Sequence, residues 1–192
     1  MKKNPNSIKA KNILRICVIG AECTGKSTLS KALAEHYSTN WVPEYARTYL
    51  EKLRRPYNQD DLLKIANGQI RIEDEWIRDS NKLVIMDTNL LVIKVWSEHK
   101  YGVCDPGIIL QHEQRHYDHY LLTDIDIPWE NDPQREHPQL REHFGNLYHQ
   151  LIKITGVPFT LISGAAEERM KKSIDVVEEL LQKRAATNPA IE

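Results

Sequence analysis

The chain has 192 residues, in which 26 Lys and Arg balance 27 Asp and Glu to a formal net charge of −1. This balance offers no electrostatic argument for binding to nucleic acid or to a membrane surface, and no apolar run approaches the ~20 residues that span a bilayer. Three widely spaced cysteines indicate neither a disulfide framework nor a zinc site. We expect a cytoplasmic protein without nucleic-acid or membrane partners, while its oligomeric state stays open.

The chain opens with a strand, a glycine-rich loop and a helix. Residues 14–19 are an apolar run that predicts a buried strand, and the apolar spacing of residues 27–37 predicts a helix. Between them Gly20–Ser27, GAECTGKS, fits the P-loop pattern G-x-x-x-x-G-K-[ST]. In such a loop the backbone N–H groups and the helix N-terminus bind phosphate. We therefore expect a nucleotide to bind here.

Individual residues of this loop have specific expected roles. Lys26 would reach the β- and γ-phosphates of ATP, and Ser27 would place its hydroxyl on Mg²⁺. The expected nucleotide-binding set is Gly20, Glu22, Cys23, Thr24, Gly25, Lys26, Ser27 and Thr28. The alternative interpretation is a glycine-rich turn before an ordinary helix. Such a turn would not need the Lys-Ser pair after the second glycine.

After this unit, apolar runs and helical spacings alternate along the chain. The predicted strands are 40–43, 82–87, 119–123 and 157–162, and the predicted helices are 44–53, 58–79, 89–100, 106–116, 139–155 and 166–183. This alternation predicts an α/β fold with right-handed crossovers. We expect a three-layer P-loop NTPase or kinase-like domain over residues 14–184, with a five-stranded, mainly parallel sheet, helices on both faces and a lid loop. Residues 1–13 and 185–192 are expected to be tails, the first of them flexible.

Two acids follow predicted strands, at the sheet edge where ligands bind in such folds. Asp87 closes an apolar strand, as a Walker B acid does, and could hold Mg²⁺ or accept a proton from a substrate hydroxyl. Its alternative role is to cap the next helix. Glu44 could bind substrate or take that proton, or it could form an exposed i,i+3 pair with Arg47.

The polar segment Asp126–Arg135 lacks a core-forming pattern and contains Trp129. A long loop of this kind over a phosphate site could be a lid that brings Arg135 onto the transferring phosphoryl group. The alternatives are a plain solvent loop and a catalytic role for Arg141 instead. The expected catalytic set is therefore Lys26, Glu44, Asp87 and Arg135, with Ser27 and Asp87 as the metal ligands.

Several segments together resemble the ribosylnicotinamide kinase domain of the NadR family, a P-loop group among AAA-type ATPase domains. They are the loop from Gly20 to Leu29, Pro43–Arg47 (PEYAR), Asp87–Asn89, Tyr117–Leu122, Asp126–Trp129 (DIPW) with Asp132 and Arg135, and Ile162–Gly164 with Glu168 and Arg169. The similarity runs from about Leu14 to Leu181. The PEYAR and DIPW segments are more specific than the P-loop, which many NTPases share.

The resemblance implies ATP- and Mg²⁺-dependent phosphorylation of nicotinamide riboside (NR) to nicotinamide mononucleotide. It also implies a substrate-binding set of Glu44, Tyr45, Arg47, Asp87, Asp126 and Trp129. Phosphorylation of another nucleoside remains an alternative, and so does a nucleotide-switched regulatory ATPase module without a phosphorylated small-molecule product.

This chain departs from the family pattern at two positions. Asn89 stands where the family often has a second acid, and Pro133 replaces a lid glycine, which should stiffen the lid. NadR proteins also carry an adenylyltransferase domain. Because few residues precede Leu14, we expect that activity to be absent.

Overall fold

The computed structural model describes residues 13–187 and contains a five-stranded sheet in the order β2-β3-β1-β4-β5. The central strand β1 (Leu14–Ile19) pairs with β3 (Leu83–Asp87) and with β4 (His119–Thr123). The edges are β2 (Asn40–Val42) and β5 (Phe159–Ile162). Every strand pairing within the described residues is parallel, which confirms the predicted α/β fold.

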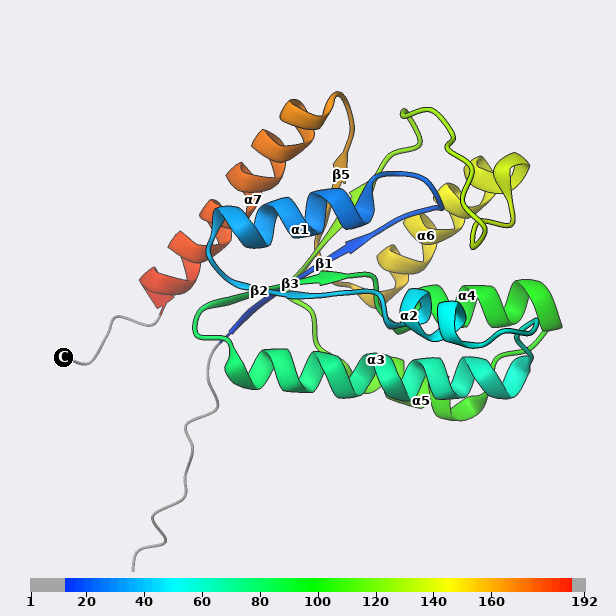
Figure 1. The fold of residues 1–192 in the computed structure, drawn as a ribbon. Coiled ribbons are helices and arrows are strands. Elements are labelled where there is room, and N and C mark those ends of the chain that lie inside the picture. Colours follow the sequence, from blue (N-terminus) through cyan, green and yellow to red (C-terminus); the bar gives the residue numbers. More distant parts are fainter. Residues whose placement is uncertain (1–12, 188–192) are drawn as a thin grey trace, which may run out of the picture.

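Helices cover both faces of this sheet (Figure 1). One face packs against α1 (Lys26–His36) and α7 (Ala166–Thr187), and the other packs against α4 (Leu90–Tyr101) and α6 (Arg141–Thr155). Side chains alternate between these two cores along β1 because successive strand residues point to opposite faces. Ile16 and Val18 belong to the first core, whereas Cys17 and Ile19 belong to the second.

A third core lies among helices beyond the sheet. It joins α2 (Tyr45–Lys52), α3 (Gln59–Asp79), α4 and α5 (Pro106–Gln114). Asn58 begins α3 with a capping box, in which its side chain accepts from the N–H of Asp61 and Asp61 accepts in return. Figure 1 shows α2 and α3 on the lower side of the sheet, opposite α1 and α7.

Two predicted helices end two or more residues away from their ends in the structure. Helix α5 ends at Gln114 rather than at His116, because Arg115 is extended and directs its guanidinium to Glu73 and Asp74 on α3. Helix α7 continues to Thr187, past the predicted end at Lys183 and into the predicted tail. The rest of the predicted tails, residues 1–12 and 188–192, lies outside the described residues.

The lid segment, which we define as residues 124–137, connects β4 to the short 3-10 helix η1 (Pro138–Leu140). It arcs beside the turn between β1 and α1 (Figure 1). Three prolines interrupt residues 128–138, and each removes a backbone N–H donor. Over residues 13–187, no helix is both long enough and apolar enough to cross a membrane.

Candidate active site

Glycines in the P-loop are required by its backbone and by close packing. Gly20 has a φ of +154°, and a Cβ at this position would collide with the Thr123 hydroxyl. Gly25 has a φ of +76° and precedes the first turn of α1. Both φ values lie where side chains other than glycine are disfavoured. The loop between β1 and α1 therefore has the backbone that a phosphate-binding turn requires.

A buried network below the loop holds it against β4 and α7. Thr24 Oγ1 donates to Ala21 O at 2.8 Å and lies 2.7 Å from Thr123 Oγ1. The Thr24 carbonyl accepts a 2.8 Å hydrogen bond from Arg169 Nη1, and only 5% of the Arg169 surface is exposed. No role for Arg169 was predicted from the sequence, since it lies 145 positions from Thr24. Its place in the segment that resembles the NadR family was the available signal.

Asp87 ends β3 directly beside the P-loop and is 1% exposed. Its Oδ1 is buried without a hydrogen-bond partner among the described residues. Burial raises the pKa of Asp87, while a hydrogen bond from Ser27 and the charge of Lys26 oppose that shift. The cap of α4 is Asn89, whose side chain accepts from Leu91 N, so the capping alternative for Asp87 is wrong. A buried carboxylate oxygen beside a hydroxyl fits the hard oxygen ligands that Mg²⁺ prefers.

Lys26 is the cation of this site. Its Nζ donates a 2.6 Å hydrogen bond to the Ala21 carbonyl within the same loop. Burial lowers the pKa of Lys26, and the nearby carboxylates of Glu44, Asp87 and Glu22 oppose that change. The ammonium therefore experiences the charges of three carboxylates, in the loop that is predicted to bind phosphate.

Glu44 precedes α2 and faces the same group of charges. Burial and the neighbouring Asp87 carboxylate raise the pKa of Glu44 to about 7, against the opposing effects of Lys26 and Arg47. Arg47 does not pair with Glu44: its Nη1 lies 2.9 Å from Asp132 Oδ2 in the lid segment. The exposed Glu44–Arg47 pair is therefore wrong. A carboxyl group with a pKa near 7 can exchange protons at neutral pH.

Both arginines considered for catalysis contact Cys23 in the P-loop. Arg135 Nη1 donates to Cys23 Sγ at 3.2 Å and to Glu130 O at 2.6 Å. Arg141 Nη2 donates to the carbonyls of Cys23 at 2.8 Å and Ile127 at 3.0 Å. The Trp129 ring lies 6.0 Å and 5.8 Å from the two guanidinium carbons. The lid segment is thus packed against the P-loop through these two cations.

Two cavities adjoin the P-loop. The smaller one, of about 110 Å³, is lined by residues 22–28 and by Glu44, Arg47, Val92, Trp96, Gln134 and Arg135. The larger one, of about 520 Å³, is lined by Glu22, Arg47, Leu50, Glu51, Arg55, Pro56, Tyr57, Trp96, His99, Lys100, residues 132–134, Glu136 and His137. They share four residues, Glu22, Arg47, Trp96 and Gln134. A phosphate-sized space therefore opens beside a nucleoside-sized one.

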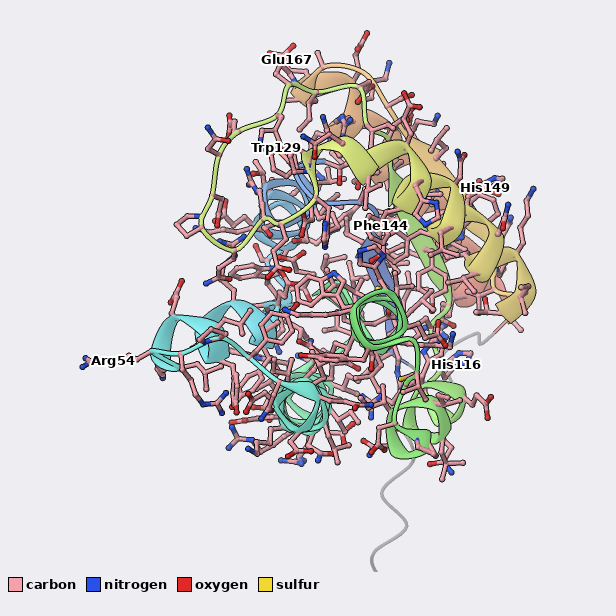
Figure 2. All side chains as sticks on the ribbon, turned by 90° about the vertical axis from the view of Figure 1, so that its right-hand side faces the viewer. Arg54, His116, Trp129, Phe144, His149 and Glu167 are labelled. Atoms are coloured by element: carbon pink, nitrogen blue, oxygen red, sulfur yellow. The ribbon has the colours of Figure 1, made fainter. Side chains whose placement is uncertain are left out.

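Four residues of the predicted substrate-binding set, Tyr45, Asp87, Asp126 and Trp129, lie outside both cavity linings. Tyr45 packs against Gly68 of α3, where a Cβ would collide with its ring. Asp126 accepts from Gly164 N at 2.5 Å and forms an ion pair with Arg169. Trp129 packs beside Arg135 and Arg141 and donates to Asn131, and Figure 2 shows it on the lid segment. Tyr45, Asp126 and Trp129 support the fold around the site in this structure, and Asp87 is buried beside Ser27, whereas Glu44 and Arg47 line the cavities.

The strand, loop and helix at β1 and α1, with an acid ending β3, define a P-loop domain of kinase-like architecture. The chain belongs to the AAA domain family, which it matches over residues 15–169. It is 24% identical over 186 residues to the trifunctional NAD biosynthesis/regulator protein NadR of Salmonella typhimurium, a match covering 92% of this chain and 45% of that protein. The chain thus spans about half the length of this curated relative.

Solved structures share the fold. Two NadR structures, one in complex with NAD and AMP-PNP and one in complex with NR, each match 88% of this chain. Their TM-scores are 0.70 and 0.71, their identities are 22% and 20%, and the matches cover 49% and 50% of those chains. Thymidylate kinase from Ehrlichia chaffeensis has a TM-score of 0.61 at 16% identity, over 86% of this chain and 99% of its own. The resemblance to NadR is confirmed.

Proposed function

We propose that this domain transfers the γ-phosphoryl group of ATP to the 5′-hydroxyl of nicotinamide riboside. The observation that carries this proposal is the adjacency of the two cavities, which share Glu22, Arg47, Trp96 and Gln134. A polyphosphate end bound by the P-loop would meet a nucleoside hydroxyl at this shared wall. Phosphoryl transfer depends mainly on such positioning.

The character of the larger cavity favours a cationic base. Trp96 and Tyr57 supply aromatic rings, and the four carboxylates of the lining outnumber its three cations, Arg47, Arg55 and Lys100. Lys100 Nζ lies 3.5 Å from the centre of the Tyr57 ring and 3.9 Å from Glu136 Oε2, so this wall already attracts a cation. A positively charged pyridinium ring is attracted both by aromatic faces and by nearby carboxylates. Nicotinamide riboside carries that charge, whereas the common purine and pyrimidine nucleosides are neutral. This difference supports nicotinamide riboside over the alternative nucleosides.

The position of each residue in the site indicates its role in the proposed reaction. Lys26 and the loop N–H groups would bind the phosphates, and Ser27 with Asp87 would hold Mg²⁺. When bound, the metal neutralises charge on the phosphate oxygens. Glu44, whose pKa is about 7, would accept the proton of the 5′-hydroxyl as the oxygen attacks the γ-phosphorus and ADP leaves. Arg135 lies on the small cavity with Lys26 and would face the charge on the transferred group.

One assay tests this proposal. Purified full chain is mixed with ATP and Mg²⁺, and ADP release is measured with and without nicotinamide riboside, while mass spectrometry detects nicotinamide mononucleotide. We expect ADP and mononucleotide in equal amounts, and neither product above background with the Lys26→Ala variant. An ADP release rate that is the same with and without the nucleoside would indicate a regulatory ATPase instead. Faster turnover of adenosine, cytidine or thymidine would reassign the substrate.

A further inference from the structure

The Glu22 side chain of the P-loop contacts the lid segment and also lines the smaller cavity. The Glu22 carboxylate accepts hydrogen bonds from two consecutive backbone N–H groups of the lid segment. Glu136 N lies 3.2 Å and His137 N lies 3.1 Å from Glu22 Oε2. These contacts join positions 114 and 115 residues apart. Hydrogen bonds to an ionised acceptor are about twice as strong as neutral ones.

The two partners of Glu22 belong to the other cavity. Glu136 and His137 both line the larger space, and Glu22 itself lines both spaces. The His137 ring also packs at 4.7 Å from His99 and at 5.6 Å from Phe144 on α6. Glu22 therefore links the P-loop directly to one wall of the larger cavity.

We propose that Glu22 is a positioning residue that couples nucleotide binding in the P-loop to nucleoside binding in the larger cavity. This inference rests on the proposed function, because it takes the larger cavity as the nucleoside site. Phosphate binding orders the loop backbone, and the ordered loop holds the Glu22 carboxylate in place for Glu136 N and His137 N. The lid wall of the nucleoside cavity is then already formed when the nucleoside arrives.

The coupling is reciprocal and positive. When the first ligand has already ordered the site of the second, the second ligand binds without a further loss of conformational entropy there. Each ligand must therefore raise the affinity for the other by the same factor, which typically lies between about 5 and 150 in coupled sites. Loss of the Glu22 carboxylate should remove this factor. Because Glu22 lines both cavities, each separate affinity also changes, so the quantity to compare is the ratio of affinities with and without the other ligand.

The test measures the dissociation constant of nicotinamide riboside by calorimetry, with and without saturating Mg²⁺·AMP-PNP. We expect at least about fivefold tightening in the wild-type chain and in Glu142→Ala, a control that removes an exposed carboxylate of α6. In Glu22→Ala, Mg²⁺·AMP-PNP should lower the dissociation constant of nicotinamide riboside by less than about twofold. Glu22→Gln keeps an acceptor oxygen of equal reach, so its change in this constant should lie between those of wild type and Glu22→Ala. A merely structural role would weaken affinity but leave this ratio unchanged.

A second readout does not need the nucleoside. Hydrogen exchange at the amides of Glu136 and His137 should quicken about tenfold in Glu22→Ala while the amides of β3 keep wild-type protection. Unchanged exchange at these amides, or an equal coupling factor in wild type and Glu22→Ala, would overturn the role of Glu22. If wild type binds AMP-PNP but not nicotinamide riboside, the proposed function and the coupling both fall. Quickened exchange in Glu22→Ala would then still establish the contact between Glu22 and the lid.

Discussion

Arg47 Nη1 lies 2.9 Å from Asp132 Oδ2, so an ion pair joins the first turn of α2 to the lid segment. Both residues line the larger cavity, and Gln134 adds a second link through its hydrogen bond to the Arg47 carbonyl. Helix α2 begins directly after Glu44. The pair therefore fixes the lid relative to the helix that carries the candidate base.

Disruption of this pair should affect nucleoside binding more than stability. The two side chains are 42% and 20% exposed, and ion pairs with this exposure contribute less than about 1 kcal/mol to the free energy of unfolding. We expect Asp132→Ala to raise the KM for nicotinamide riboside several-fold at nearly unchanged unfolding temperature. Lys94→Ala, which breaks the remote pair with Glu98, is the matched control and should leave KM unchanged. Equal KM values in both variants would exclude this role for the pair.

Lys26→Ala should abolish phosphoryl transfer. The ammonium is the cation inside the P-loop, and its one hydrogen bond within residues 13–187 goes to the Ala21 carbonyl of the same loop. The hydrophobic cores do not depend on that contact, so thermal unfolding should be close to wild type. Lys31→Ala, which removes an exposed ammonium from the same helix, should keep full activity. Wild-type turnover of Lys26→Ala would refute the assignment of the phosphate site.

Glu44 predicts a pH dependence of both stability and rate. Its native pKa of about 7 lies above the ordinary 4.5, so the folded state favours the protonated carboxyl group. That favourable contribution is complete below about pH 4.5 and is lost as the pH rises through 7. Relative to Glu44→Gln, the wild type should therefore lose about 1–3 kcal/mol of unfolding free energy between pH 5 and 8, by urea denaturation.

The rate should change in the opposite direction. A base must be ionised, so kcat/KM should rise with pH through about 7, since this ratio reports groups of the free enzyme. We expect Glu44→Gln to remove this limb of the profile and to lower kcat at every pH, while AMP-PNP affinity stays within about twofold. A pH profile identical to wild type in Glu44→Gln would transfer the role of base to Asp87.

Arg135 should act on the rate of transfer rather than on nucleotide affinity. A contact that strengthens as charge develops on the transferred phosphoryl group appears in kcat. We expect Arg135→Ala to lower kcat about 10²-fold and Arg135→Lys to lower it less, because lysine lacks the planar fork. The Kd for AMP-PNP should change by less than about fivefold, measured by titration beside steady-state kinetics.

The control for Arg135 is Arg54→Ala. Arg54 follows α2 and extends outward from the molecule (Figure 2). The Arg54→Ala substitution removes the same charge at an exposed position, so the kcat of this variant should equal that of wild type. If both Arg135 variants keep full kcat, the catalytic cation is Arg141 or Arg47 instead.

Asp126 should contribute to stability, in contrast to its predicted role in substrate binding. It neutralises Arg169, whose side chain is 6% exposed and holds the P-loop at Thr24. Asp126→Asn leaves a buried cation without its counter-charge, which should cost about 2 kcal/mol because Asp126 is partly exposed. The KM for nicotinamide riboside should stay near wild type. Glu167→Gln on the neighbouring helix turn, which is exposed in Figure 2, should change neither quantity.

The sequence by itself determined the succession of strands and helices along the chain and the position of the phosphate loop. Both depend on local patterns: apolar runs for the strands, helical spacing for α1 to α7, and the fixed glycines and Lys26 of the P-loop. Asp87 and Glu44 were also identified, because a parallel sheet brings strand ends to one edge wherever those strands occur in the chain. These predictions therefore needed no knowledge of which segments touch.

Only the tertiary structure decided the partners of the charged side chains. Arg47 pairs with Asp132 across 85 positions, and Arg169 reaches Thr24 across 145. No periodicity relates residues so far apart, and the nearest opposite charge in sequence, Glu44 for Arg47, was the wrong partner. The directions of the Tyr45 and Trp129 side chains were not predictable for the same reason, since a sequence motif names a side chain without giving its direction. Direction depends on how the lid segment and α3 pack, and that packing is a property of the whole fold.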